Sequence, residues 1–443
     1  MKMKRILSLL LLFLMLASVS LMFSGCGQEV DYLYIYNWGE YMPLEDDEYS
    51  FDVLSLFEEY YEQKTGRPLE VVYSIFSSNE EMYAKLKNGA SKIDLIIPSD
   101  YMVERLIAED RLAPLDIENN IPNIKNIAAD YRAPDYDRDG KYSVPYTFGL
   151  VGLIVNMKMV EEMGYSEDFA DPDNVSWRIL WDEKYKGNIL TFNNARDAFG
   201  IAQYILSAEN GATSQEDNYI NEKTDKSRWD AALELLKQQK PLVQAYVMDE
   251  VFNKMESGAA VMAPYYAGDF YTMQEINPDL EFFYPKEGTN VFVDAFCIPK
   301  DTPDDRKAIA EMFINFTLDT EVTVDGEVYN VAENIAEYIC YATPNEAVTS
   351  HLWDEDGEDG YDFIDEDGVL DPVLYPDRED YPTYYFQNLP PEMLEYQNSL
   401  WEQLKIGGGG DTGIYIFTGI ILAGIAALMI FHFVRRRRRE KFY

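Results

Sequence analysis

The sequence predicts an α/β protein with two lobes, each a central sheet flanked by helices, and a C-terminal transmembrane helix. Three observations support this fold class. Short apolar strands alternate with amphipathic helices in two separate regions of the chain, which is typical of sheets with crossover helices. The length of 443 residues suffices for two or three domains. An uncharged apolar stretch runs from 414 to 434.

Three predicted strands alternate with helices in the first lobe, at 32–36, 70–74 and 93–97. The helix after the first strand has an apolar face and stops at Gly66. Ser78 and Glu81 have the spacing of a capping box, so a second helix should begin there. This β-α-β-α-β order implies parallel strands joined by crossover helices.

A second series of strands, at 150–155, 188–192 and 259–264, implies a second lobe. Residues 291–298 have the pattern of a β-strand, in which every second side chain points to the same face. Phe292, Asp294 and Phe296 should therefore share one face of this strand. Residues 304–317 carry the apolar stripe of a helix. We expect the chain to cross between the lobes near 145–150 and 286–292. The predicted lobes comprise residues 30–148 with 290–340, and residues 149–289 with 341–405.

Both ends of the chain carry membrane signals. Residues 1–26 look like a bacterial lipoprotein signal peptide, with a basic start, an apolar core and small residues before Cys26, the expected lipidation site. A helix over 414–434 would be about 31 Å long, which matches a bilayer core. The arginine-rich tail 435–443 should be cytoplasmic. The Gly-rich linker 406–413 would then tether the two lobes to the outer face of the plasma membrane.

The composition is strongly acidic, with 37 Lys plus Arg against 79 Asp plus Glu and a formal net charge of −42. Apart from Glu440, every acidic residue lies between 27 and 413. Nucleic acid is therefore excluded as a partner, because binding it requires Lys and Arg to neutralise phosphates. The negative electrostatic field of so acidic a protein concentrates cations instead. Cys297 and Cys340 could pair outside the cell or remain free thiols.

Aromatic and carboxylate side chains recur directly after the predicted strands: Trp38, Glu40 and Tyr41, then Tyr101, then Asn194 and Asp197, then Tyr265, Tyr266 and Asp269. Ligands of open parallel sheets bind outside the carboxyl ends of the strands. Each of these residues alone could simply pack or cap a helix. Together they offer an alkyl ammonium cation ring faces for its methylenes and carboxylates for its charge.

Signals for catalysis are weak. The chain has two histidines, His351 and His432, and no nucleophile, zinc-protease or phosphate-loop motif. We therefore expect no enzyme, no catalytic residue and no cofactor, although an extracellular hydrolase using two carboxylates stays as a less favoured alternative. The acidic segments 135–140 and 353–371 resemble calcium loops, but Tyr146 stands where an EF-hand requires glutamate.

Five stretches carry a resemblance to a known family: 36–43, 79–87, 94–99, 284–288 and 341–345. At these residues the chain resembles the spermidine/putrescine-binding proteins of bacterial polyamine ABC transporters, which belong to the periplasmic solute-binding protein family. The likeness runs through most of 30–405. It implies a two-lobed periplasmic binding protein-like fold of type II. It also implies capture of a polyamine between the lobes and delivery to permease and ATPase subunits.

The resemblance also implies a role for individual residues. Trp38, Glu40 and Tyr41 would hold one end of the polyamine, and Ser99 and Tyr101 would line the wall of the first lobe. Asp294 would bind a terminal ammonium, flanked by Phe292, Tyr341 and Gln387. Asp197 would meet an amine nearer the middle, with Asn194 and Tyr265 beside it.

Three positions in or beside this set depart from the family's pattern. Asn194 stands where a second aspartate is common, Tyr265 where a tryptophan is usual, and Gly39 where a hydroxyl residue is usual. The missing carboxylate makes putrescine as plausible as spermidine. The adjacent Tyr265 and Tyr266 also resemble the tyrosine pair of ferric-ion binders, which leaves another cation as an alternative ligand.

Overall fold

The computed structural model describes residues 29–44, 51–89, 92–212, 214, 217–352, 360–365, 367–377 and 381–406. The described chain forms two compact units. Unit 1 ends at Phe148 and resumes over Phe292–Tyr375, whereas unit 2 covers Gly149–Val291 and begins again at Pro376. Residues 341–375, which the sequence analysis assigned to the second lobe, lie in unit 1. The chain therefore passes between the units three times.

Two long strands belong to both units. Strand β4 spans Ser143–Asn156 and strand β9 spans Thr289–Cys297, and every residue in both is buried. The sequence analysis predicted only 150–155 of β4. The part that was not predicted contains Pro145 and Gly149, and both residue types are rare inside strands.

The sheet of unit 1 has the order β2-β1-β3-β9, with β4 next to β9. Strands β1 (Asp31–Trp38), β2 (Leu69–Phe76) and β3 (Leu95–Ile96) pair in parallel, and β9 pairs with β3 in the antiparallel direction. The three predicted strands and their parallel order are confirmed. A hairpin of β10 (Val322–Val324) and β11 (Glu327–Tyr329) lies apart from the sheet.

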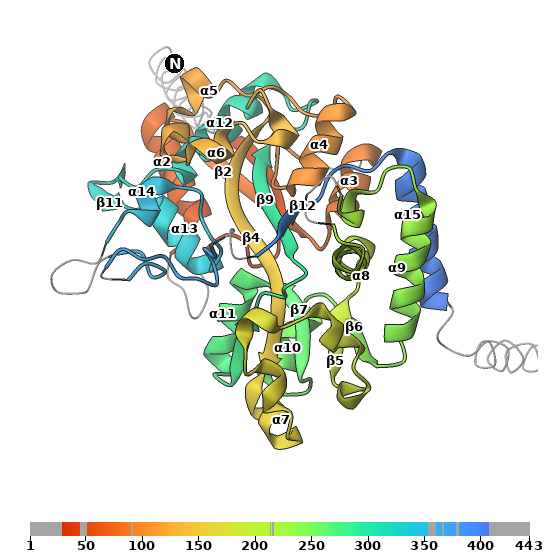
Figure 1. The fold of residues 1–443 in the computed structure, drawn as a ribbon. Helices are drawn as coiled ribbons and strands as arrows, with labels where there is room; N and C mark the ends of the chain where they lie inside the picture. Colours follow the sequence, from red (N-terminus) through yellow and green to blue (C-terminus); the bar gives the residue numbers. More distant parts are fainter. Residues whose placement is uncertain are drawn as a thin grey trace, which may run out of the picture. The chain divides into compact units, whose positions relative to one another are not determined.

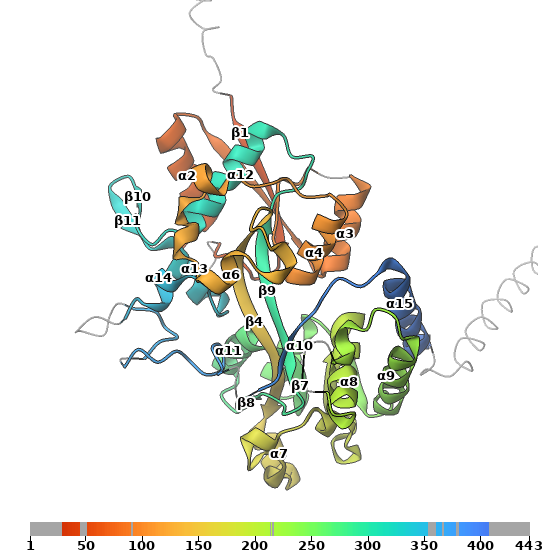
Figure 2. The same cartoon turned by 45° about the horizontal axis from the view of Figure 1, so that its top comes forward.

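Helices cover both sides of this sheet, with α2 (Val53–Thr65) and α12 (Asp304–Thr317) on one side and α3 (Asn79–Asn88) and α4 (Asp100–Ala108) on the other (Figures 1 and 2). The Ser78 hydroxyl accepts from the Glu81 N–H at 3.2 Å, as the capping box predicts. The Glu81 carboxylate accepts instead from the Ser77 N–H at 3.0 Å. The remaining helices of unit 1 are α5 (Ile117–Asn120), η1 (Pro122–Asn126), α6 (Ala129–Arg132), η2 (Asp135–Asp137), α13 (Val331–Ile339) and α14 (Glu346–Thr349).

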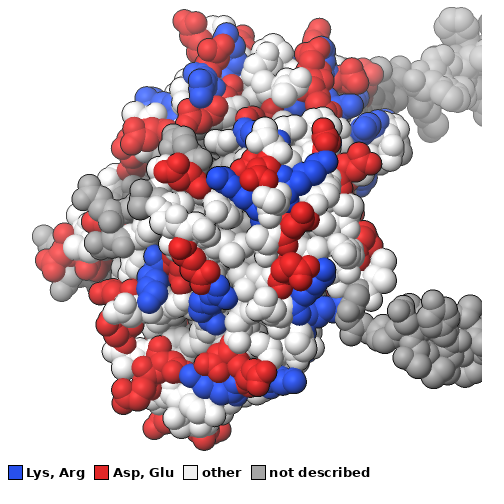
Figure 3. Space-filling model, turned by 45° about the vertical axis from the view of Figure 1, so that its right-hand side comes forward, with Lys and Arg blue, Asp and Glu red and all other residues white. Residues whose placement is uncertain are grey.

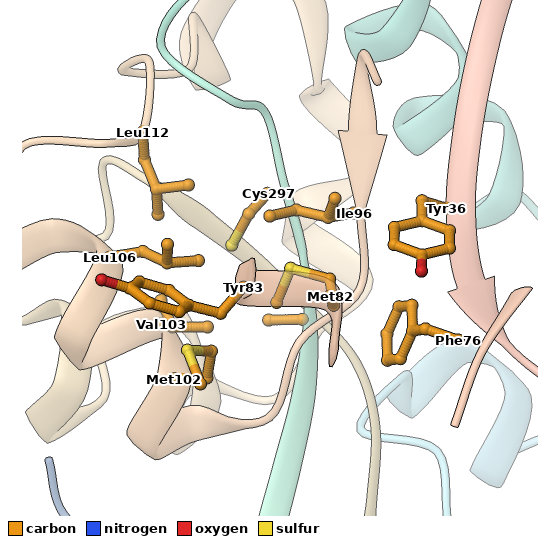
Figure 4. Packing of buried hydrophobic residues seen from close by; sticks show 11 residues of the cluster. Tyr36, Phe76, Met82, Tyr83, Ile96, Met102, Val103, Leu106, Leu112 and Cys297 are labelled. Carbon is orange, nitrogen blue, oxygen red and sulfur yellow. The ribbon is translucent and has the colours of Figure 1, made fainter. Parts of the chain in front are cut away.

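One hydrophobic cluster of unit 1 lies where Tyr36, Phe76 and Ile96 meet residues of α3 and α4 (Figure 4). Cys297 is fully buried in this cluster, and burial raises the pKa of its thiol. Cys297 and Cys340 are both free cysteines, so they form no disulfide. Cys297 therefore contributes as a small apolar side chain.

The sheet of unit 2 has the order β4-β7-β5-β6, with β8 (Leu280–Phe283) pairing with β4. Strand β5 (Ile189–Phe192) runs parallel to β6 (Val243–Val247) and to β7 (Met262–Tyr266), whereas β4 and β7 are antiparallel. A last strand, β12 (Thr383–Tyr385), pairs in parallel with the start of β9. The second α/β lobe is thus confirmed, with a mixed sheet.

Helices α8 (Ala195–Glu209), α9 (Lys226–Gln239) and α15 (Pro391–Ile406) pack together in unit 2 (Figure 2). The other helices of this unit are α7 (Met157–Met163), η3 (Ser166–Phe169), η4 (Pro172–Asn174), η5 (Trp177–Trp181), η6 (Glu183–Tyr185), η7 (Tyr219–Asn221), α10 (Glu250–Glu256) and α11 (Ala267–Ile276). Within the described ranges no helix is long and apolar enough to cross a membrane. The predicted signal peptide, Cys26 and the span 414–434 lie outside those ranges.

Candidate functional site

The carboxyl ends of β1 and β3 place the first site residues of unit 1. Trp38 ends β1, where its ring packs on Phe76 with centroids 4.5 Å apart. Its indole N–H donates to the Ile97 carbonyl at 2.8 Å. The same carbonyl belongs to the end of the third predicted strand, so the ring is fixed between two neighbouring strand ends.

Tyr41 lies at the centre of a buried chain of hydroxyls. Its Oη donates to Asp294 Oδ2 at 2.7 Å and lies 2.7 Å from Thr147 Oγ1. Because the single proton of Tyr41 goes to Asp294, Thr147 must donate to Tyr41. Tyr146 donates to the Tyr41 carbonyl at 2.8 Å and so fixes its backbone.

Asp294 is a carboxylate held in a buried position with one oxygen available. The residue is 4% exposed, and among the described residues its Oδ1 has no hydrogen-bond partner. Burial raises the pKa of Asp294 to about 6, although the Ser99 and Tyr41 hydroxyls act to lower it. A buried carboxylate costs free energy unless its charge is compensated. The arrangement therefore favours a cation at Oδ1.

Aromatic rings surround this carboxylate. The Tyr341 ring meets the Tyr41 ring edge to face at 5.4 Å, and the Phe292 ring at 6.0 Å. All three rings are buried. Ring faces attract cations and cover methylene groups, so these rings suit an organic cation better than a metal ion.

The other predicted residues of unit 1 are fixed by neighbours of their own. The Asn79 amide donates to Ser99 Oγ at 3.0 Å, and the backbones of Ser99 and Asp294 form an antiparallel bridge. Tyr101 donates to Glu80 at 3.1 Å. Glu40 is exposed, has a left-handed φ of 49°, and accepts from the Tyr338 hydroxyl at 3.4 Å. Glu40 is therefore a carboxylate in contact with solvent, unlike Asp294.

In unit 2 the start of α8 positions the predicted acidic residue. Asn194 caps the helix, its Oδ1 accepting from the Asp197 N–H at 2.8 Å. The Asn194 amide and the Tyr266 hydroxyl both donate to Asp197 Oδ2, at 2.6 and 3.1 Å. Two neutral donors thus fix the orientation of the Asp197 carboxylate.

Tyr265 packs against Tyr266, the residue whose hydroxyl donates to the Asp197 carboxylate. It is buried, stacks on Phe192 with centroids 5.7 Å apart, and contacts the Tyr266 ring at 4.9 Å. Burial, and then the negative charges of Asp269 and Asp249, raise the pKa of Tyr265. Burial and Asp197 raise the pKa of Tyr266. Both phenol groups are therefore neutral in the ligand-free protein.

Gln387 follows β12 and is held at its backbone. Its N–H donates to Asn221 Oδ1 at 2.8 Å, and its carbonyl accepts from the Arg196 guanidinium at 3.0 Å. The side chain of Gln387 is half-buried. Arg196 and Asn221 were not among the predicted site residues.

The structure thus brings several predicted residues together within each unit. In unit 1, Tyr41, Ser99, Phe292, Asp294 and Tyr341 form one group, with Trp38, Glu40 and Tyr101 at neighbouring strand ends. In unit 2, Asn194 and Asp197 contact each other, and Tyr265 lies behind them. Sequence reasoning missed Thr147, Tyr146, Asn79 and Arg196. Tyr266, which donates to Asp197, was noted in the sequence as a residue that follows a predicted strand, but it was not given a role in the site.

The acidic segment 135–140 uses its central carboxylate for its own backbone. Asp137 is buried and accepts from the backbone N–H groups of Lys141, Tyr142 and Ser143, at 2.8 to 3.2 Å. Within the described ranges, no three His, Cys, Asp or Glu side chains group as a metal site would need. Part of the second acidic segment, 353–359 and 366, lies outside those ranges.

The two α/β units, with carboxylates and rings at their strand ends, define a binding protein rather than an enzyme. The chain belongs to the bacterial extracellular solute-binding protein family, whose sequence pattern matches residues 56–326. This membership confirms the predicted non-enzymatic role, and it sets the carboxylate-pair hydrolase aside.

Particular relatives agree with the resemblance found in the sequence. The spermidine/putrescine-binding periplasmic protein of Escherichia coli is 29% identical over 379 residues, which cover 85% of this chain and 92% of the relative. The putrescine/cadaverine-binding protein of Pseudomonas aeruginosa is 29% identical over 315 residues, covering 68% of this chain and 79% of the relative.

Solved structures show the same mixed α/β periplasmic binding protein fold. A candidate spermidine/putrescine ABC transporter protein from Listeria monocytogenes has a TM-score of 0.66 at 31% identity, and the substrate-binding protein PotD from Streptococcus pneumoniae has 0.61 at 29%. Each match covers 85% of this chain and 99% of the other.

Proposed function

We propose that this protein captures a small linear polyamine, spermidine or putrescine, and delivers it to the permease and ATPase subunits of an ABC transporter. One observation carries the proposal: Asp294 is buried among aromatic rings with an unpartnered carboxylate oxygen. An ammonium group satisfies that oxygen, and the rings cover the adjoining methylenes. The relatives named for spermidine, putrescine and cadaverine support the same ligand class.

Each charged residue has a separate part in this proposal. Asp294 binds one terminal ammonium in the dry part of unit 1. Glu40, which is exposed, binds the other end where water remains available. In unit 2, Asp197 meets a further amine, with Asn194 and Tyr266 holding its carboxylate in place. Trp38, Ser99, Tyr101, Tyr265, Phe292, Tyr341 and Gln387 complete the contacts.

A panel of ligands tests the proposal. Putrescine, cadaverine and spermidine should each raise the melting temperature of the full chain in detergent, and calorimetry should show which binds most tightly. Asp294→Ala should abolish the shift, because the buried ammonium loses its partner. Asp135→Ala is the matched control, since the Asp135 side chain is 99% exposed and pairs with Arg138. A folded chain that binds no polyamine at millimolar concentration would refute the assignment.

We further propose that the protein acts at the outer face of the plasma membrane. The lipoprotein-like start ending at Cys26 and the apolar stretch 414–434 support two anchors. Relatives described as periplasmic support the extracytoplasmic location. Removing residues 407–443 should leave polyamine affinity unchanged but reduce uptake, if the second anchor keeps the protein near its permease. Unchanged uptake by the truncated chain would contradict that role.

A further inference from the structure

Two side chains of unit 2 hold the backbone on both sides of Phe386. Asn221, at the end of η7, donates from its amide to the Tyr385 carbonyl at 2.8 Å and accepts from the Gln387 N–H at 2.8 Å. The Arg196 guanidinium donates to the Gln387 carbonyl at 3.0 Å and to Asn221 Oδ1 at 2.9 Å. The backbone at Gln387 is therefore tied to η7 and to the first turn of α8.

The ring of Phe386 is seated on the same face of α8. The Arg196 guanidinium carbon lies 4.3 Å from the ring centroid. Gly200 follows Arg196 by four residues, so both face the same side of the helix. A Cβ added to Gly200 would come within 3.0 Å of Phe386 Cζ. An alanine at this position would therefore press on the ring of Phe386, which would have to shift by a few tenths of an ångström.

We propose that Arg196, Gly200 and Asn221 are positioning residues that set the place of the Gln387 side chain, and through it the affinity for the ligand. This inference rests on the proposed function, in which Gln387 contacts the polyamine. Arg196 carries the same charge sign as the ligand, so direct contact between them would be repulsive. Its observed bonds go to a carbonyl and an amide oxygen instead, which suits a role in placing the segment.

A double-mutant cycle on the full chain in detergent tests the inference, with putrescine and spermidine as probes in calorimetry. Arg196→Met should weaken binding by no more than Gln387→Ala does, about 3- to 10-fold for one hydrogen bond. In the Gln387→Ala background, Arg196→Met should have no further effect. Arg196→Lys should restore part of the affinity, because it keeps one charged donor. Arg178→Met is the matched control, since Arg178 pairs with Glu209 at the other end of α8.

Gly200→Ala gives an independent test if Arg196→Met fails to fold. Alanine favours helix more than glycine does, so melting temperature should be unchanged or higher. Affinity should nevertheless fall about 3-fold or more, because the displaced ring shifts Gln387. A merely structural role would not lower affinity while preserving stability. The loss should again vanish in the Gln387→Ala background.

Two kinds of outcome overturn the inference. If Gln387→Ala changes nothing, or if the effects of Gln387→Ala and of Arg196→Met or Gly200→Ala simply add, these residues do not act through Gln387. In either case, binding of polyamine by the wild-type protein under these conditions would still support the proposed function. Wild-type protein that binds neither probe refutes both, and that result is seen before any variant is compared.

Discussion

At the scale of single residues, Asp294 links ligand binding to pH. Its pKa of about 6 in the ligand-free protein means that it takes up a proton as the pH falls below that value. An ammonium ligand needs the ionised carboxylate, so binding and protonation compete. We expect affinity to fall about tenfold per pH unit below pH 6 and to be level above pH 7. Calorimetry at pH 5, 6 and 7.5 measures this, and a level profile down to pH 5 would contradict it.

The same residue should cost the empty protein stability. A folded-state pKa above the ordinary aspartate value means that stability is present at low pH and is lost as the pH rises through about 6. Asp294→Asn should therefore stabilise the ligand-free chain at pH 8 by about 3 kcal/mol, yet weaken polyamine binding. Denaturant unfolding at pH 8 and pH 4.5 tests the sign. If Asp294→Asn leaves the free energy of unfolding at pH 8 unchanged, the charge of Asp294 is already compensated in the ligand-free protein.

Thr147 is expected to act on the ligand through Tyr41. Thr147→Val removes the donor to the Tyr41 oxygen and leaves that buried oxygen without it. Affinity should fall about 3- to 10-fold, as measured by calorimetry. Thr317→Val is the matched control, because Thr317 is equally buried in unit 1 but donates to the Ile314 carbonyl within α12. Equal losses in the two variants would point to a general effect of packing.

At the scale of elements, helix α13 carries a half-buried acidic residue, Glu337, next to a residue that contacts the site. Burial, and then Asp362 and Glu333, raise the pKa of Glu337 to about 7. The His351 ring lies 2.6 Å from the Glu333 carboxylate and acts to lower the pKa of Glu337. One residue further along α13, the Tyr338 hydroxyl donates to Glu40. The stability of this helix should therefore depend on pH.

Replacing Glu337 tests that dependence. Because the folded-state pKa lies above the ordinary value, stability is lost as the pH rises through about 7. Glu337→Gln should raise the melting temperature at pH 8 and leave it unchanged at pH 4.5. Glu346→Gln, exposed on α14, should change neither value. An equal rise in melting temperature at both pH values would show that ionisation of Glu337 is not the cause.

Elements with a clear period were predictable from the sequence, whereas the start of β4 was not. The capped helices α2 and α3 and the strands β1 and β2 lie where periodicity and caps placed them. The first half of β4 escaped notice because it contains Pro145 and Gly149, residue types that are rare inside strands. Thr147 lies in that half, and its partner Tyr41 is 106 residues away. A contact of that kind depends on tertiary packing, so residue spacing could not indicate it.

At the scale of the whole molecule, the chain carries a large excess of acidic over basic residues. Figure 3 shows acidic and basic side chains interspersed over one face. The net charge of −42 still produces a negative field at long range. Of the acidic residues, only Glu40, Asp197 and Asp294 are proposed to touch the ligand. The remaining acidity should therefore influence how fast a polycation arrives more than how long it stays.

Varying the salt concentration separates the effect of charge on the association rate from its effect on the dissociation rate. Exposed charges are screened over about 10 Å at 0.1 M salt and about 3 Å at 1 M, whereas the contacts of buried Asp294 are screened far less. Raising sodium chloride from 0.02 to 0.5 M should lower the association rate of spermidine about tenfold or more and change its dissociation rate much less. Putrescine, with fewer charges, should show a shallower dependence. Stopped-flow measurements with sucrose as an uncharged control would test this, and a salt effect confined to dissociation would place the electrostatic contribution in the site itself.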